Sequence, residues 1–152
     1  MIMSFYGFVV FIHIIAAVCG LGAVFANPSI MKRGTTVNKA KQALETAKDV
    51  EKFAKIGSIA LLLTGLLLGL LNPSLFTEGW YIAALILYLA VQPIVAYMIP
   101  KKAENLYVLL EKQDSDTLPA EFMPIAMQIA KLDNIARASV FILILLMSLK
   151  PF

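Results

Sequence analysis

Charged side chains are scarce in this sequence of 152 residues, and long stretches have none at all. Only 15% of the residues are Asp, Glu, Lys or Arg, whereas 60% are hydrophobic; a typical soluble domain has about 25% charged residues. A soluble chain of this length cannot bury so much apolar surface, because small domains have a high ratio of surface to volume. The composition therefore excludes a soluble enzyme and a nucleic-acid-binding domain, and no nucleic-acid partner is expected.

Cysteine and histidine are also nearly absent, with one of each. A single cysteine excludes an internal disulfide, a CxxC redox motif and a zinc site built from cysteines. The sequence also contains no P-loop, no GxSxG nucleophile motif and no HExxH zinc motif. Any chemistry must therefore centre on a few isolated side chains.

Four runs of the sequence carry no charge, and they contain 31, 22, 22 and 12 residues: Met1–Met31, Ile56–Thr77, Gly79–Pro100 and Ala138–Leu149. An uncharged, mostly apolar run of about 18 or more residues is typical of a transmembrane helix. We predict an all-α integral membrane four-helix bundle, with spans near residues 5–26, 56–76, 80–99 and 134–149. The last span is short, and Arg137 and Lys150 would extend toward its two interfaces.

Twelve of the thirteen basic residues lie in the segments 27–55 and 100–133 or, for Arg137, just inside the last span. By the positive-inside rule these segments are cytoplasmic, so both termini are predicted outside the cell membrane. Thr36 is a suitable N-cap, and only Gly57 could interrupt a helix running on into the second span. We therefore predict long helical cytoplasmic extensions.

Proline, small residues and one pair of charges suggest local features of these helices. Pro93 is expected to kink the third span. Glycine or alanine four residues apart predicts close helix contacts in the first two spans, at Ala16 and Gly20, Gly22 and Ala26, and Gly65 and Gly69. Asp133 and Arg137 are four apart and are expected to pair on one helix face. No acid lies within a predicted span, which disfavours a proton-coupled drug exporter built around a membrane-embedded glutamate.

His13, the only histidine, lies about a third of the way into the first span from its outer end. An ionisable residue at this depth is a candidate functional site, and imidazole is a common ligand of haem iron and of metal ions. Ala17 and Gly20 share its helix face and leave room for a flat macrocycle. Tyr88 and Gln92 form a polar face that we expect to turn into the bundle. These five residues make up the predicted pocket.

Two questions about His13 stay open at this point. It could instead be a neutral structural histidine, hydrogen-bonded to Tyr88, Gln92 or a backbone carbonyl. If it binds haem b, the chain offers no second histidine. The other axial ligand would then be Met98, Met147, a tyrosine, a lysine, water or a residue of another subunit.

Three motifs together resemble a known family. They are FxHxxAAxxGLG over Phe11–Gly22, LLLTGLLLGL over Leu61–Leu70, and a terminal MSLKPF, with a third span that begins at Trp80. The sequence is similar to a bacterial family of short, four-span integral membrane proteins of unknown function, grouped with the copper-resistance CopD proteins and with HemJ, a haem-associated protoporphyrinogen oxidase. The resemblance implies a four-helix bundle with His13 in the position of a proposed haem or metal ligand.

Three functions follow as hypotheses. The leading one is a small haem- or metal-associated, redox-linked membrane protein with His13 as a ligand. The second is a non-catalytic accessory subunit of a larger membrane complex, or a homo-oligomer, held by its small-residue faces. The third is a copper or small-solute permease, for which Met1, Met3, His13 and Cys19 could form a path of soft ligands.

Overall fold

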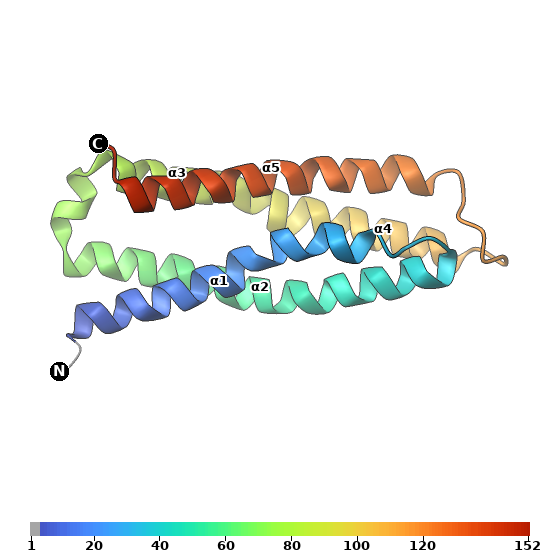
Figure 1. The fold of residues 1–152 in the computed structure, drawn as a ribbon, viewed down its shortest axis with the longest axis horizontal. Coiled ribbons are helices and arrows are strands. Elements are labelled where there is room, and N and C mark those ends of the chain that lie inside the picture. The colour runs from blue at the N-terminus through green and yellow to red at the C-terminus, as the bar shows by residue number, and fades with distance from the viewer. Residues whose placement is uncertain (1–3) are drawn as a thin grey trace.

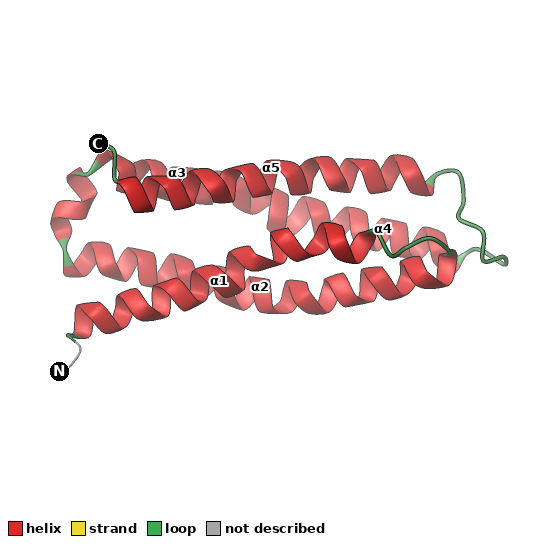
Figure 2. Ribbon diagram, viewed as in Figure 1, coloured by secondary structure: helices red, strands yellow, loops and turns green. Residues whose placement is uncertain are grey.

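The computed structural model describes residues 4–152, and these residues fold into helices without a strand (Figures 1 and 2). Four stretches are long and apolar enough to cross a membrane, which confirms the predicted all-α bundle. In chain order the elements are α1 (Phe5–Met31), α2 (Val37–Leu71), a 3-10 helix (Pro73–Thr77), α3 (Gly79–Pro93), a π-helical turn (Ile94–Met98), α4 (Ile99–Glu111) and α5 (Phe122–Leu149).

Helix α2 shows that the chain extends well beyond a bilayer. Its 35 residues are about 52 Å long at 1.5 Å per residue, whereas the hydrocarbon core is about 30 Å thick. The predicted continuity from the basic segment into the second span is confirmed. So is the N-cap, because the Thr36 hydroxyl accepts a hydrogen bond from the Lys39 amide at 3.4 Å. The helix ends at Leu71, before the predicted limit at Phe76, because Pro73 cannot continue it and starts the 3-10 helix instead.

The third apolar stretch runs from Gly79 to Glu111 and changes its geometry after Pro93. The predicted disturbance at this proline takes the form of a π-helical turn over Ile94–Met98. Proline has no amide hydrogen to donate, and a π turn is one way in which a helix accommodates the lost hydrogen bond. Helix α4 follows directly, so α3, the π turn and α4 form one continuous helical rod.

Helices α1 and α2 cross (Figure 1), and two glycines lie where their backbones meet. A Cβ atom added to Gly20 would lie 2.7 Å from the Ser58 backbone nitrogen, and one added to Gly57 would lie 2.8 Å from the Cys19 carbonyl carbon. Glycine is therefore required on both sides of the crossing, since no real Cβ atom makes such contacts. Gly22, by contrast, has no described atom within 4 Å of such a position.

The interior consists of three hydrophobic clusters stacked along the bundle. The cluster nearest the chain termini contains Ala16, Leu61, Ala84, Tyr88 and Leu143. The middle cluster contains Val24, Val91 and Ala136. The third cluster contains Val37, Ala40, Leu44, Leu106, Leu110, Phe122 and Ile129, and so joins α2, α4 and α5.

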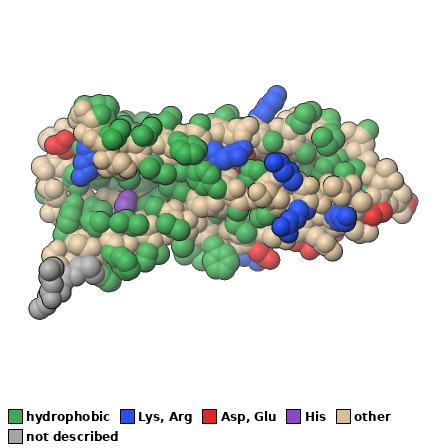
Figure 3. Space-filling view, in the orientation of Figure 1, with side chains coloured by type: hydrophobic (Ala, Val, Ile, Leu, Met, Phe, Trp, Pro, Cys, Tyr) green, Lys and Arg blue, Asp and Glu red, His purple; other side chains and the backbone are tan. Residues whose placement is uncertain are grey.

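Charged side chains gather over the half of the molecule that contains α4, whereas hydrophobic side chains cover most of the half that contains the histidine (Figure 3). Helix α1 begins and α5 ends at the same end of the bundle, away from most of these charges (Figure 1). The helices thus continue past the apolar half into a charged half with a core of its own.

The loop before α5 caps the start of α2, and this contact gives a first prediction. Asp116 accepts a hydrogen bond from the Asn38 amide through its side chain at 2.8 Å and from the Val37 amide through its carbonyl at 3.2 Å. We expect Asp116→Ala to lower the free energy of unfolding by about 1 kcal/mol, as is typical of a lost N-cap. Thermal unfolding in detergent measures the change. Asp114→Ala, in the same exposed loop, is the control and should have little effect; equal losses in the two variants would contradict the capping role.

Candidate functional site

His13 on α1 is held by Thr64 on α2. Its Nδ1 atom lies 2.8 Å from the Thr64 hydroxyl oxygen. The Thr64 hydroxyl in turn lies 2.6 Å from the Ala60 carbonyl oxygen, to which it donates its only hydrogen. The Thr64 oxygen must therefore accept from His13, so Nδ1 carries the proton and Nε2 keeps a free lone pair. The side-chain partner is thus Thr64, and it is neither Tyr88 nor Gln92. The Leu61 backbone is a further hydrogen-bond partner of the ring, as the structural alternative allows.

Gly65 provides the surface of α2 on which the imidazole ring packs. A Cβ atom on this glycine would lie 3.3 Å from His13 Cε1, so the ring packs directly on the α2 backbone. The Gly65 carbonyl oxygen accepts a hydrogen bond from the Tyr81 hydroxyl at 3.0 Å, which ties α3 to the same segment. The Nδ1–Cε1 edge of the ring thus faces α2, and Nε2 is the nitrogen available to a ligand.

A cavity of about 370 Å³ lies beside this histidine. Its volume falls within the usual range of about 300–1,000 Å³ for small-molecule sites. Its walls are mostly apolar, and they include Ala17, Ala84, Tyr81, Tyr88 and Met147. Met147 therefore shares a cavity with His13, whereas Met98 lies in the π turn and does not line it.

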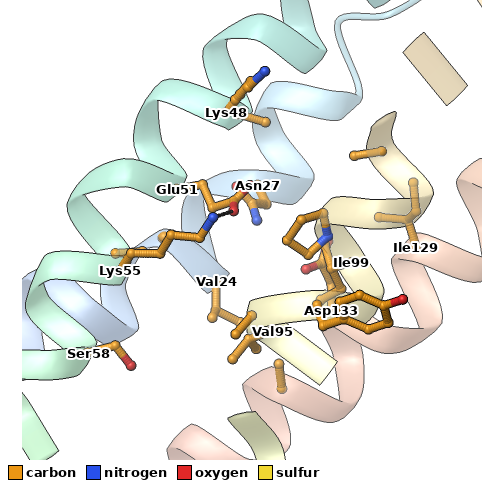
Figure 4. A pocket seen from close by; sticks show the side chains of 18 of the residues that line it. Val24, Asn27, Lys48, Glu51, Lys55, Ser58, Val95, Ile99, Ile129 and Asp133 are labelled. Carbon is orange, nitrogen blue, oxygen red and sulfur yellow. Dashed lines mark ion pairs between the residues drawn. The ribbon is translucent and has the colours of Figure 1, made fainter. Parts of the chain in front are cut away.

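A second cavity has a volume of about 1320 Å³, and its lining includes charged residues of α2 and α4. Figure 4 shows some of the side chains that line it. Gly20 and Gln92 line this cavity and not the one beside His13, while Tyr88 lines both. The five residues of the predicted pocket are thus divided between two adjoining cavities.

Tyr88, Ser58 and Gln92 form a small polar group where the two cavities meet. The Tyr88 hydroxyl donates to the Ser58 carbonyl oxygen at 2.8 Å and also contacts the Ser58 hydroxyl. The Gln92 amide nitrogen lies 3.5 Å from that hydroxyl, which is at the limit of a hydrogen bond. Tyr88 is nearly fully buried and belongs to the cluster nearest the termini, so its position is fixed.

The proposed soft-ligand path is not assembled by the described residues. Cys19 is exposed, packs on Gly57 and does not line the cavity of His13. Met1 and Met3 lie outside the described residues. Among residues 4–152, no group of three or more His, Cys, Asp or Glu side chains could hold a metal ion.

Three residues important to these cavities were not predicted as part of the pocket. Thr64 positions His13 directly, and Tyr81 does so through Gly65. The sequence signal for Thr64 is a threonine within a run of leucines. The sequence predicts Asp133 outside the last span and paired with Arg137. The structure buries it at 3% exposure on the wall of the larger cavity.

These features define a four-span helical membrane protein with a histidine-bearing cavity at one end of a bundle. Residues 7–151 match the family described as predicted integral membrane protein (DUF2269), and the chain belongs to that family. No curated protein and no solved structure is detectably similar to it.

Proposed function

We propose that this protein is a small haem-associated, redox-linked membrane protein in which His13 is a ligand of haem b iron. The observation that carries this proposal is the hydrogen-bond chain from His13 through Thr64 to the Ala60 carbonyl. It fixes one ring nitrogen as a donor and leaves the other with a lone pair beside an apolar cavity. An outer hydrogen bond of this kind is how proteins orient a ligating histidine and set its tautomer.

Haem fits this site better than a bare metal ion does. A zinc or copper ion usually takes three or four ligands from the protein. The described residues contain no such cluster of His, Cys, Asp or Glu, and His13 is the only histidine. Haem brings four nitrogen ligands in its own ring, so one histidine suffices as its protein anchor. The resemblance of Phe11–Gly22 to the CopD and HemJ group favours the same role.

The surrounding residues would bind and shield the group. Ala17 leaves space on the face of α1, and Ala84 does so on α3. Met147 shares the cavity and is the candidate for a second axial ligand. A bound haem would supply one-electron transfer, while the apolar walls would exclude water from it.

We also propose that the charged half of the molecule faces the cytoplasm. The basic residues of α2 and α4 belong to this half, as the positive-inside rule requires. Both termini would then lie outside a bacterial cytoplasmic membrane.

Absorption spectroscopy of the protein purified from its native membrane tests the haem proposal. The wild type should show a Soret band, or develop one on titration with haemin, and His13→Ala should lose it. Ile12→Ala, at the adjacent residue outside the cavity, is the control and should keep the band. If neither the purified nor the titrated wild type shows a Soret band, the proposal is wrong. Co-purification with a larger complex would then favour the accessory-subunit hypothesis, and loss of copper uptake on deletion would favour the permease.

Thr64→Val gives a second, finer prediction about the same site. Valine has nearly the shape of threonine but cannot accept the His13 Nδ1 hydrogen bond. We expect haem affinity to fall about 10–100-fold, the usual effect of losing an outer hydrogen bond to a ligand. Haemin titration measures it. Thr64→Ser keeps the hydroxyl and should retain most of the affinity; if valine and serine weaken binding equally, Thr64 acts through packing alone.

A further inference from the structure

The larger cavity lies between the α1–α2 pair and the rod formed by α3, the π turn and α4, with α5 as a further wall. Its volume of about 1320 Å³ exceeds the usual range for small-molecule sites. Most of the deeper wall is apolar and includes Val24, Val91, Val95, Ala136 and Leu143. The π turn contributes Val95 and Tyr97 to this wall. This cavity adjoins the one beside His13, but it has a different chemistry.

Asp133 is the unusual residue in this cavity. Its side chain is only 3% exposed, and its Oδ1 atom has no hydrogen-bond partner. The Asn27 side chain of α1 hydrogen-bonds to the Asp133 carboxyl group, while the Asn27 Oδ1 atom is itself buried without a partner. Both residues line the cavity (Figure 4). Two buried acceptor oxygens from different helices therefore lack a donor, an arrangement that costs free energy unless a ligand supplies one.

The expected pairing of Asp133 with Arg137 does not form. The Arg137 guanidinium instead contacts the Asn134 side-chain oxygen. The only ion pairs among residues 4–152 are Lys52 with Asp49 at 2.8 Å and Lys55 with Glu51 at 2.6 Å. Arg137 thus acts on Asp133 through its charge but forms no ion pair with it.

The other charged groups on the cavity wall balance one another. Helix α2 contributes Lys48, Lys52, Lys55, Glu45 and Glu51, and α4 contributes Lys101, Glu104 and Glu111. The Lys101 ammonium donates to the Tyr97 hydroxyl at 2.9 Å, and Glu45 accepts from Tyr107 at 3.0 Å. With four lysines and four glutamates, this part of the wall has no formal net charge, so the lining residues including Asp133 have a formal net charge of −1.

We propose that the cavity binds an organic ammonium cation with an apolar body, and that Asp133 and Asn27 receive its ammonium group. The N–H donors would satisfy both orphaned oxygens, and the positive charge would pair with the carboxylate. The apolar wall suits a hydrophobic body, and the volume of the cavity is larger than a bare alkali ion needs. Tyr88 and Tyr107, which also line the cavity, offer aromatic faces that attract cations.

The test uses the full-length protein in nanodiscs and 1-naphthylmethylamine as the fluorescent probe. Equilibrium dialysis should show saturable binding of the amine, whereas the neutral isostere 1-naphthylmethanol should bind at least about tenfold more weakly, as expected for the loss of a charged hydrogen bond. Asp133→Asn, of nearly the same shape, should weaken amine binding at least about tenfold. Glu104→Gln removes one negative charge from the same wall and should change the affinity less than about twofold.

Stability gives a second readout that guards against simple misfolding of the variant. The amine should raise the melting temperature of the wild type and not that of Asp133→Asn. Without ligand, Asp133→Asn should melt no lower than the wild type, because it removes an unpaired buried carboxylate.

Three results would overturn the proposal. The first is equal binding of the amine and the alcohol. The second is an equal loss of affinity in Asp133→Asn and Glu104→Gln. The third is an absence of amine binding at every pH from 6 to 9. Binding of radioactive sodium would then identify Asp133 as part of an inorganic-cation site, and its absence would identify Asp133 as a protonated carboxyl group. None of these readouts involves haem, so this test and that of the proposed function fail separately.

Discussion

Replacing Gly57 with leucine is expected to force α1 and α2 apart and to lower the free energy of unfolding by about 3 kcal/mol or more. A side chain at this position would begin 2.8 Å from the Cys19 carbonyl carbon and equally close to its Cβ atom. Backbone cannot yield as a flexible side chain does, so the crossing must open. Opening it exposes the contacts around Gly20 and shifts α2 relative to His13. Unfolding by SDS titration in mixed micelles measures the loss.

Gly22→Leu is the matched control for Gly57→Leu. It adds the same atoms to the same pair of helices, but no described atom lies within 4 Å of a Cβ at Gly22. Leucine also has the higher helix propensity, by about 0.8 kcal/mol. This variant should therefore be as stable as the wild type or more so. If both variants lose stability equally, added bulk in the membrane is responsible and the crossing is not the cause.

The architecture was predictable because lipid imposes a simple rule on composition. A helix that crosses a membrane excludes charge over about 20 residues, and the charge-free runs of this sequence mark the four helices directly. The continuity of α2 was also predictable, because only Gly57 interrupts its helix-forming residues. The role of Gly57 in the crossing was not predictable, because a glycine in the sequence does not show which residue of another helix it will contact.

The histidine site was predictable in part. His13 stood out as the only histidine, and Ala17 and Tyr88 indeed line the same cavity. Its hydrogen-bond partner depends on the relative depth of α1 and α2, which the sequence does not define to within a helical turn. Thr64 and His13 are 51 residues apart, and their contact follows from the Gly20–Gly57 crossing.

The burial of Asp133 was not predictable from charge counts, because such counts do not show which way a single side chain faces. Asp133 lies five residues before the last charge-free run, and Arg137, four residues on, is within reach on the same helix face. Helix α5 in fact begins at Phe122, so Asp133 lies well within it and faces inward. Arg137 turns to Asn134, one helical turn back, and leaves the carboxylate in the cavity.

The two cavities meet at a common layer of side chains, which links the two proposed sites. Leu21, Leu62, Tyr88 and Leu143 line both. Tyr88 and Leu143 belong to the buried cluster nearest the termini, and Tyr88 is hydrogen-bonded to α2 through Ser58. A ligand that moved this layer would change the shape of both cavities. Coupling of the two sites would thus require a shift of Tyr88 and its hydrogen bond.

The charged half of the molecule should unfold separately from the apolar half when its own core is damaged. Leu106 of α4 is fully buried, and its cluster joins α2, α4 and α5 beyond the region around His13. We expect Leu106→Ala to cost about 2–5 kcal/mol, the usual range for a buried leucine. Val108→Ala, two residues on and 42% exposed, should cost less than about 1 kcal/mol.

Hydrogen exchange distinguishes local from global unfolding in Leu106→Ala. Amides of α4 and of the first turns of α2 should exchange faster, while those around His13 and Gly65 keep their protection, because these positions belong to different clusters. Haemin binding at the proposed site should then survive the substitution. Faster exchange throughout α1 would show instead that the bundle unfolds as one cooperative unit.

The large cavity lies across the boundary between the two halves, with Leu44 and Ile129 on one side and Leu143 on the other. Local unfolding of the charged half would therefore open this cavity and leave the histidine site intact.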